Sequence, residues 1–159
     1  MSDAIVINTG PLVALSQANA LDVVRQLPVR LVTSETVQRE FLRGVELGHQ
    51  LAAWPDWVAV LALHEPLQPL ATVGLDVGEA SVIQLAIDQS IRTVCIDEVQ
   101  GRRCAKALGL QVTGSLGLLG MAKRLGLIDA VRPLVAAMSS HGNWFREDLV
   151  ARFLSELGE

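Results

Sequence analysis

Short apolar runs alternate with helical patterns along most of the chain. Five of these runs have the length and composition of buried strands, because apolar and β-branched residues are bounded there by polar or turn residues. A helical pattern follows each run, and strands that alternate with helices form a mostly parallel sheet. The sequence therefore predicts an α/β fold on five strands, which are Ala4–Ile7, Arg30–Val32, Val58–Leu61, Thr93–Ile96 and Leu110–Val112.

Capping residues, glycines and prolines indicate where the helices begin and end. Thr33 and Ser34 are expected to cap a helix in which Val37 and Phe41, one turn apart, face the core. Pro11 suits a first helical turn, and Gly109 and Gly126 are expected to end helices. With these signals, the helices after the first strand's own are expected at Asp22–Leu27, Glu35–Leu42, Gly44–Ala53, from Asp76 through Ile87, from Ser115 to Arg124, at Arg132–Ser140 and at Arg146–Leu157.

Two helices carry apolar stripes that predict how they pack. Ala80, Ile83 and Ile87 follow the helical period in the central helix. In the last helix, Leu149, Phe153 and Leu157 form a stripe that would pack on the domain or on a second subunit. Residues 64–73, which include two prolines, predict an irregular connector.

Length and composition narrow the functional class. The 159 residues fit one domain, residues 1–159, and 50% hydrophobic with 19% charged residues excludes a disordered chain. The net charge of −4 argues against a protein that coats nucleic acid by bulk electrostatics. Cys95 and Cys104 match no zinc pattern and suit a reducing compartment. Without a signal peptide or a long apolar segment, we expect a cytoplasmic protein.

Polar residues follow the predicted strands or begin the helices after them. Asn8 ends the first strand, Asp97 and Glu98 end the fourth, and Asp76 and Glu79 begin the central helix. The carboxyl ends of parallel strands meet at one edge of the sheet, where such folds bind ligands. Several carboxylates at one edge favour a hard divalent cation such as Mg²⁺ or Mn²⁺. Glu40 is expected to reach the same edge.

Each of these residues also has a purely structural interpretation. Asn8 could cap a helix, Asp76 with Glu79 could form a capping box, and Asp97 could cap a helix with Gln100 three residues later. Glu40 could instead pair with Arg43, three residues along the same helix.

Two further features could contact nucleic acid. Arg102 and Lys106, four residues apart, predict a basic face that is either solvated or holds phosphates, with Arg103 beside it. Trp54 and Trp57 flank Pro55 and could stack bases, although the packing of a turn or a subunit contact is the commoner role for such residues.

The order and spacing of these motifs resemble a PIN domain of the subgroup related to VapC-type toxins. The matching stretches are Ile5–Leu15, Leu75–Ala80 with Ile83 and Leu85–Ala86, Ile96–Glu98, Arg102–Arg103, Leu108–Leu110 and Val112–Gly117. The resemblance implies a three-layer α/β/α sandwich and a metal-dependent ribonuclease. It also implies a homodimer and an antitoxin partner.

The family pattern assigns roles to positions of this chain. It implies Glu40, Glu79 and Asp97 as catalytic acids. It implies Mg²⁺ or Mn²⁺ bound by Asn8, Glu40, Asp76, Glu79, Asp97 and Glu98. Our own candidates for RNA contacts are Thr9, Arg102, Arg103, Lys106 and Ser115. The first of these positions is usually aspartate in the family, and Asn8 brings no charge. A catalytically weakened module that binds RNA or protein is therefore the alternative.

Other α/β proteins with an acidic edge fit less well. A haloacid-dehalogenase-type phosphatase needs an aspartate nucleophile where the chain has Asn8, and a phosphate-receiver domain needs a lysine near Thr113. The sequence lacks a glycine loop that ends in Lys-Ser or Lys-Thr, which excludes a P-loop nucleotide hydrolase.

Overall fold

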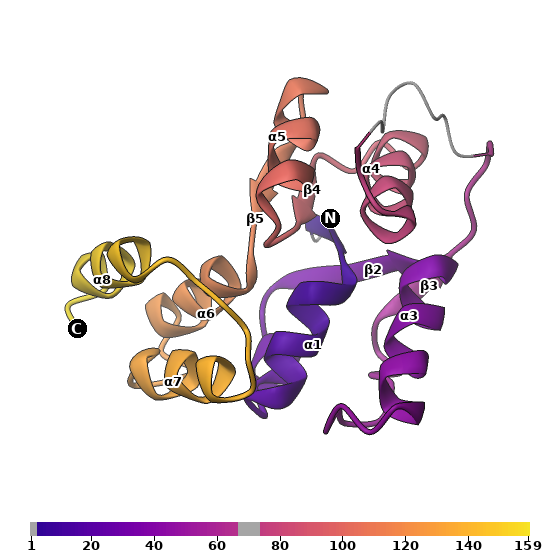
Figure 1. Ribbon diagram of the computed structural model, residues 1–159. Helices are drawn as coiled ribbons and strands as arrows, with labels where there is room; N and C mark the ends of the chain where they lie inside the picture. The colour runs from indigo at the N-terminus through magenta and orange to yellow at the C-terminus, as the bar shows by residue number, and fades with distance from the viewer. Residues whose placement is uncertain (1–2, 67–73) are drawn as a thin grey trace.

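The computed structural model describes residues 3–66 and 74–159, and its centre is a five-stranded sheet (Figure 1). All the pairings between neighbouring strands are parallel, which confirms the predicted fold class. The strands lie within two residues of their predicted bounds. They are β1 (Asp3–Ile7), β2 (Val29–Ser34), β3 (Ala59–Leu61), β4 (Thr93–Cys95) and β5 (Gln111–Thr113).

The strand order is β3-β2-β1-β4-β5, so β1 lies at the centre of the sheet. Val6 of β1 is in register with Val32 of β2 on one side and with Val94 of β4 on the other. From β1 the chain builds the sheet outward through β2 and β3, and it then returns to β4 on the other side. In open α/β sheets, a crevice for ligands forms where the strand order reverses in this way. Here that point lies between the carboxyl ends of β1 and β4.

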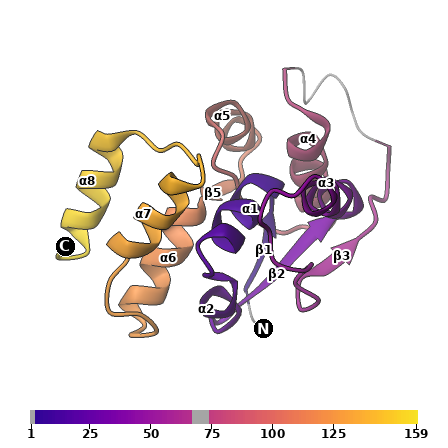
Figure 2. The ribbon, with the colours of Figure 1, turned by 60° about the horizontal axis from the view of Figure 1, so that its bottom comes forward.

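Helices cover both faces of the sheet. Figure 1 shows α1 and α3 on one side and α4 and α5 on the other, which confirms the three-layer arrangement. In Figure 2, α6, α7 and α8 lie side by side next to α1. The helices are α1 (Thr9–Gln17), α2 (Leu21–Arg25), α3 (Glu35–Glu46), α4 (Val77–Asp88), α5 (Val99–Ala107), α6 (Ser115–Arg124), α7 (Arg132–Ser140) and α8 (Glu147–Glu156).

The core follows the predicted apolar pattern. Val6, Val32 and Val94 are fully buried in the three central strands, and Val37 and Phe41 are fully buried on α3, as predicted. Helix α4 is buried continuously from Gly78 to Ala86 because other elements surround it. Among residues 3–66 and 74–159, none of the helices combines the length and apolar character needed to cross a bilayer.

The helix predicted at Gly44–Ala53 is wrong. Helix α3 continues through Gly44 to Glu46, and the chain then turns through Gly48 and Gln50, which have φ angles of +76° and +57°. Left-handed backbone of this kind interrupts a right-handed helix. Residues 64–66 of the predicted connector contain no regular structure, and residues 67–73 lie outside the described residues.

Two predicted packing stripes also need correction. Ile87 is 48% exposed because it follows the buried part of α4. On α8, Leu149 is 46% exposed and Leu154, which lies outside the predicted stripe, is buried. Helix α8 meets the domain mainly through its second half, where Phe153 lies against Gly120 of α6: a Cβ atom at Gly120 would be 2.9 Å from the Phe153 ring.

Trp54 has a packing role. Its ring meets that of Phe41 edge-on at a centroid distance of 5.4 Å, so it covers the buried face of α3. This contact confirms the structural interpretation for Trp54.

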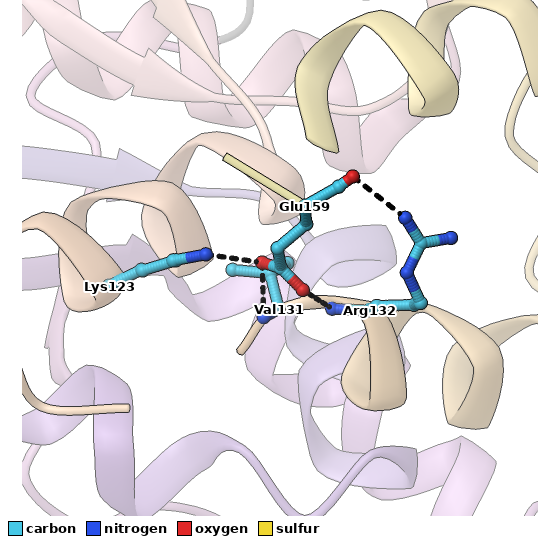
Figure 3. A network of polar contacts seen from close by, with 4 residues as sticks. All are labelled: Lys123, Val131, Arg132 and Glu159. Carbon is cyan, nitrogen blue, oxygen red and sulfur yellow. Dashed lines mark hydrogen bonds and ion pairs between the residues drawn. The ribbon is translucent and has the colours of Figure 1, made fainter. Parts of the chain in front are cut away.

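Glu159 holds the end of α8 against the start of α7 (Figure 3). Its carboxylate accepts hydrogen bonds from the main-chain N–H groups of Val131 and Arg132, at 2.8 and 3.0 Å, and pairs with Lys123 Nζ at 3.0 Å. Arg132 in turn donates to the Glu159 main-chain oxygen at 3.0 Å. The Val131 N–H is the main cause that lowers the Glu159 pKa to about 2, and Arg132 and Lys123 act in the same direction.

Candidate functional site

Glu40 of α3 faces the beginning of α1. The Thr9 hydroxyl, one residue after Asn8, donates a hydrogen bond to Glu40 Oε2. The alternative pairing of Glu40 with Arg43 is wrong, because Arg43 pairs with Glu46 at 3.3 Å. Thr9, predicted to contact RNA, is therefore in contact with a predicted catalytic acid.

The Glu40 carboxylate lies over the start of α4. A Cβ atom at Gly78 would come within 2.6 Å of both Glu40 carboxylate oxygens. Only glycine leaves room for this approach without displacing the carboxylate, so Gly78 is part of the site although the sequence analysis did not select it. A glycine in the first turn of a helix, where its propensity is poor, was the available signal.

Glu79, the next residue on α4, belongs to a capping box. Asp76 Oδ1 accepts from the Glu79 N–H at 2.8 Å, and Glu79 Oε2 accepts from the Asp76 N–H at 3.4 Å. This confirms the structural interpretation of the pair. The second oxygen, Glu79 Oε1, lies toward α5, where it would be 3.1 Å from a Cβ atom at Gly101. Glu79 therefore caps α4 and still presents an oxygen beyond the cap.

The surroundings of Glu79 disfavour the charged form of its carboxyl group. Burial is the main cause that raises its pKa, and the negative charge of Asp76 is the second. Glu98 and Glu40 raise the pKa further, so four carboxyl groups act on one another here. Within the described part of the chain, none of the four forms an ion pair with a basic side chain. A cation bound among them would relieve this repulsion.

Asn8 carries an unsatisfied buried atom. It is 5% exposed, and its Oδ1 has no hydrogen-bond partner among the residues that the structure describes. Asn8 occupies the N-cap position of α1, as its structural interpretation expected, but its side chain makes no capping hydrogen bond. Leaving a buried polar atom unpaired costs about 1–3 kcal/mol. An amide oxygen is also a ligand for a hard cation.

Asp97 follows β4 and is held by the start of α6. Its Oδ1 accepts from the Ser115 N–H and its Oδ2 accepts from the Ser115 hydroxyl, both at 2.8 Å. Glu98, and not Asp97, occupies the N-cap position of α5, so the predicted cap with Gln100 is wrong. Burial raises the Asp97 pKa, although the Ser115 hydrogen bonds and the Arg102 charge oppose this.

Arg102 is turned inward. Its Nη1 donates to the carbonyl oxygens of Ile96 at 2.7 Å and Thr113 at 3.1 Å, and so joins the ends of β4 and β5. The continuous basic face predicted from Arg102 to Lys106 is therefore wrong, because only Arg103 and Lys106 are exposed. The register of β4 and β5 places the two carbonyl groups together, which the sequence pattern could not reveal.

The predicted acids thus divide into two sets. Glu40 and Glu79 meet at the start of α4, with Asp76 and Glu98 as neighbouring charges, whereas Asp97 is bound to Ser115. Among residues 3–66 and 74–159, no three Asp, Glu, His or Cys side chains form a group that could hold a metal ion. Asn8 directly precedes Thr9, which contacts Glu40, so this end of the sheet offers two carboxylates and one amide oxygen. Hard cations prefer oxygen ligands of these kinds, and the unpaired Asn8 Oδ1 is free to act as one of them.

Comparison with known proteins places this geometry in a family. The sequence matches a family model described as DUF3368, PIN domain, over residues 4–159. No curated protein and no solved structure matches significantly. PIN domains have a nuclease-type fold, and they usually use divalent metal ions. Because the match covers nearly the whole chain, this protein belongs to the PIN-domain family.

Proposed function

We propose that the protein is a divalent-metal-dependent ribonuclease that hydrolyses RNA phosphodiester bonds. The observation that carries the proposal is the convergence of Glu40 and Glu79 at the start of α4 without a basic partner among the described residues. The buried, unpaired Asn8 oxygen supports it further.

Glu40, Glu79 and Asn8 would hold Mg²⁺ or Mn²⁺, because all three offer oxygen ligands. Such an ion lowers the pKa of a bound water and stabilises the charge that develops on a phosphate. Asp76 and Glu98 would add negative charge that attracts the ion.

The remaining residues would hold these ligands in place. Thr9 fixes the Glu40 carboxylate, and the capping box fixes Glu79. Each oxygen of Asp97 accepts one hydrogen bond from Ser115 and keeps a second lone pair. We assign Asp97 as the third catalytic acid, which would use these lone pairs to orient the attacking water. Arg103 and Lys106, exposed on α5, are candidates for contacts with RNA phosphates.

The alternative is a weakened PIN module that binds RNA or protein without cutting it. It is favoured by Asn8, which contributes no charge, and by the lack of a group of three acids that could hold a metal ion among residues 3–66 and 74–159. A module of this kind would not need to bind a metal ion, whereas a nuclease must.

The test is cleavage of a single-stranded RNA with Mn²⁺ and with EDTA, by the native protein and by Glu40→Gln, Asp97→Ala and Asn8→Asp. Glu46→Gln is the matched control, because Glu46 lies on the same helix and is exposed. The proposal expects Mn²⁺-dependent cleavage by the native protein and the control, and its loss in Glu40→Gln and Asp97→Ala.

Two results would argue otherwise. Cleavage by Asn8→Asp alone would mean that activity has been lost at this one position. An absence of cleavage by every variant, together with RNA binding, would support the module.

The resemblance to VapC-type toxins extends the proposal. It suggests a toxin that an antitoxin restrains, a homodimer, and action in the cytoplasm. The antitoxin and the homodimer rest on that resemblance alone, whereas the cytoplasmic location is the expectation already drawn from the sequence.

A further inference from the structure

A cavity lies at the opposite end of the sheet from the acids. Its volume is about 600 Å³, and its lining consists of Arg25, Leu27, Pro28, Val29, Arg30, Leu31 and Trp57. These residues surround the beginning of β2, whereas the acidic site lies near the strands' carboxyl ends. Figure 2 shows α2, which ends at Arg25, beside the N-terminal end of the sheet. The six residues of β2 separate the two ends by about 17–20 Å.

The floor of this cavity is apolar and its rim is basic. Leu27 and Leu31 are buried beneath it, and Trp57 forms a half-buried aromatic wall. Arg25 and Arg30 are exposed, and neither forms a hydrogen bond or an ion pair with any described residue. Arginines that form no ion pair with a described carboxylate remain available for an anion.

Trp57 also borders a second hollow. Trp57 lines a smaller cavity of about 180 Å³ together with Pro55, Asn19 and Asp22. Trp57 therefore borders two hollows, one lined also by Asp22 and the other by both arginines. This difference in charge makes the arginine side the one that suits an anionic ligand.

We infer that the cavity formed by Arg25, Arg30 and Trp57 binds single-stranded RNA, with a base against Trp57 and phosphates at the arginines. An aromatic ring stacks any base, and arginines contact the backbone, which is how single strands are bound without sequence preference. The chain carries a net charge of −4, so two unpaired arginines beside one aromatic ring form a locally positive site. Such a site attracts a polyanion. The inference takes its ligand class from the proposed function, and it adds a second contact for a strand that extends from the acidic site.

The test measures binding of a fluorescein-labelled single-stranded RNA of about 16 nucleotides in EDTA, which removes the contribution of the metal. Arg25→Ala/Arg30→Ala should weaken binding about tenfold. The slope of log affinity against log salt should become shallower by about 1.4, or about 0.7 for each lost phosphate contact. Arg124→Ala/Arg152→Ala is the control, because it removes the same charge from exposed positions on α6 and in the middle of α8, and it should change binding less than twofold.

Tryptophan fluorescence gives a second readout. RNA should quench the native protein, and Trp57→Phe should lose most of this quenching, whereas Trp144→Phe, at a position 80% exposed, should keep it. Equal weakening by both arginine pairs would overturn the inference, because binding would then be non-specific. A native dimer that Arg25→Ala/Arg30→Ala converts to monomers would assign the cavity to a second copy of the chain and would also overturn it.

The inference and the nuclease proposal can fail separately. Binding in EDTA that depends on Arg25 and Arg30, without Mn²⁺-dependent cleavage, would retain the cavity and reject the nuclease. If Arg25→Ala/Arg30→Ala cleaves long and short RNA at the native rates and binds RNA as tightly as the native protein, the nuclease proposal stands and the RNA-binding role of the cavity is rejected.

Discussion

The carboxylate of Glu40 occupies the space where Gly78 lacks a side chain. A methyl group at Gly78 would lie 2.6 Å from each of the two carboxylate oxygens. This contact joins α3 to the first turn of α4, and it brings Glu40 next to Glu79. The geometry of the proposed metal site therefore depends on the absence of a Cβ atom at Gly78.

Gly78→Ala is expected to weaken Mn²⁺ binding without destabilising the fold. The new methyl group displaces the end of an exposed, flexible side chain, and replacing glycine by alanine in a helix stabilises by about 0.4–1 kcal/mol. Calorimetric Mn²⁺ titration and thermal unfolding in EDTA would measure the two effects. Gly10→Ala is the control, since no atom lies within 4 Å of its Cβ position. Equal Mn²⁺ affinities in both variants would contradict the proposed site.

Asn8→Asp is expected to have opposite effects with and without metal. In EDTA, the new carboxylate is buried without a counter-charge, and because burial disfavours the charged form, the melting temperature should fall. With Mn²⁺ at about 100 times its Kd, binding should stabilise the variant by about 2.7 kcal/mol. The variant should reach this stabilisation at a lower Mn²⁺ concentration than the native protein, because its Kd should be lower. Melting curves across a Mn²⁺ series would show this. A melting temperature that does not respond to Mn²⁺ would count against Asn8 as a ligand.

Glu79→Gln should stabilise the metal-free protein at neutral pH. Burial and the nearby acids raise the Glu79 pKa, so the folded protein holds this proton more tightly than the unfolded chain. Stability is then lost as pH rises from the unfolded pKa, near 4.5, through the raised folded pKa. Glutamine removes this loss, so melting temperatures in EDTA from pH 4 to 7 should fall less steeply in the variant. A steeper fall would show that Glu79 is stabilised by an interaction other than those described.

Arg102→Ala should destabilise the protein much more than Arg103→Ala. Arg102 donates to two carbonyl groups at the ends of β4 and β5, and hydrogen bonds from a charged group contribute about 1.5–3 kcal/mol. Arg103 is exposed, and its loss should stay within about 0.5 kcal/mol. Urea unfolding of the two variants makes the comparison. Similar losses would mean that Arg102 contributes only its charge.

Glu159→Gln should remove a step in acid stability. The folded pKa of Glu159 is about 2, below its usual 4.5, so its contribution is complete above pH 4.5 and is lost as pH falls toward 2. The native protein should lose stability across this interval, and the variant should lose less. Urea unfolding at pH 5 and pH 3 would measure the difference. Glu156→Gln, at an exposed position of the same helix, should behave like the native protein.

The sequence revealed the sheet because local patterns specify it. Buried strands such as Ile5–Ile7 and Val94–Cys95 are apolar throughout, and the polar residues after them mark the carboxyl edge. The helix expected after Gly44 was wrong because its composition is compatible with a helix, whereas the left-handed turn at Gln50 lies between two hydrogen bonds to α1, from Gln17 to the His49 carbonyl and from the Ala52 N–H to Ser16.

The pairing inside the site could not be predicted in the same way. Asp97 and Ser115 meet because β4 and β5 are in register at Cys95 and Thr113, and this register depends on the whole fold. The contact between Glu40 and Thr9 likewise depends on how α3 is placed against α1. Residue type and spacing could place these acids at one edge, but only the assembled layers decide which partner each one takes.

The central position of β1 has a consequence for synthesis on the ribosome. β1, β2 and β3 are neighbours in the sheet and come first in the chain, so they can pair while the rest is still being made. The other edge of β1 has no partner until Thr93–Cys95 emerges, past the midpoint of the 159 residues. An open, apolar strand edge is prone to wrong pairing with other chains. The nascent protein is therefore most vulnerable to aggregation during this interval, and no complete acidic site exists before it ends.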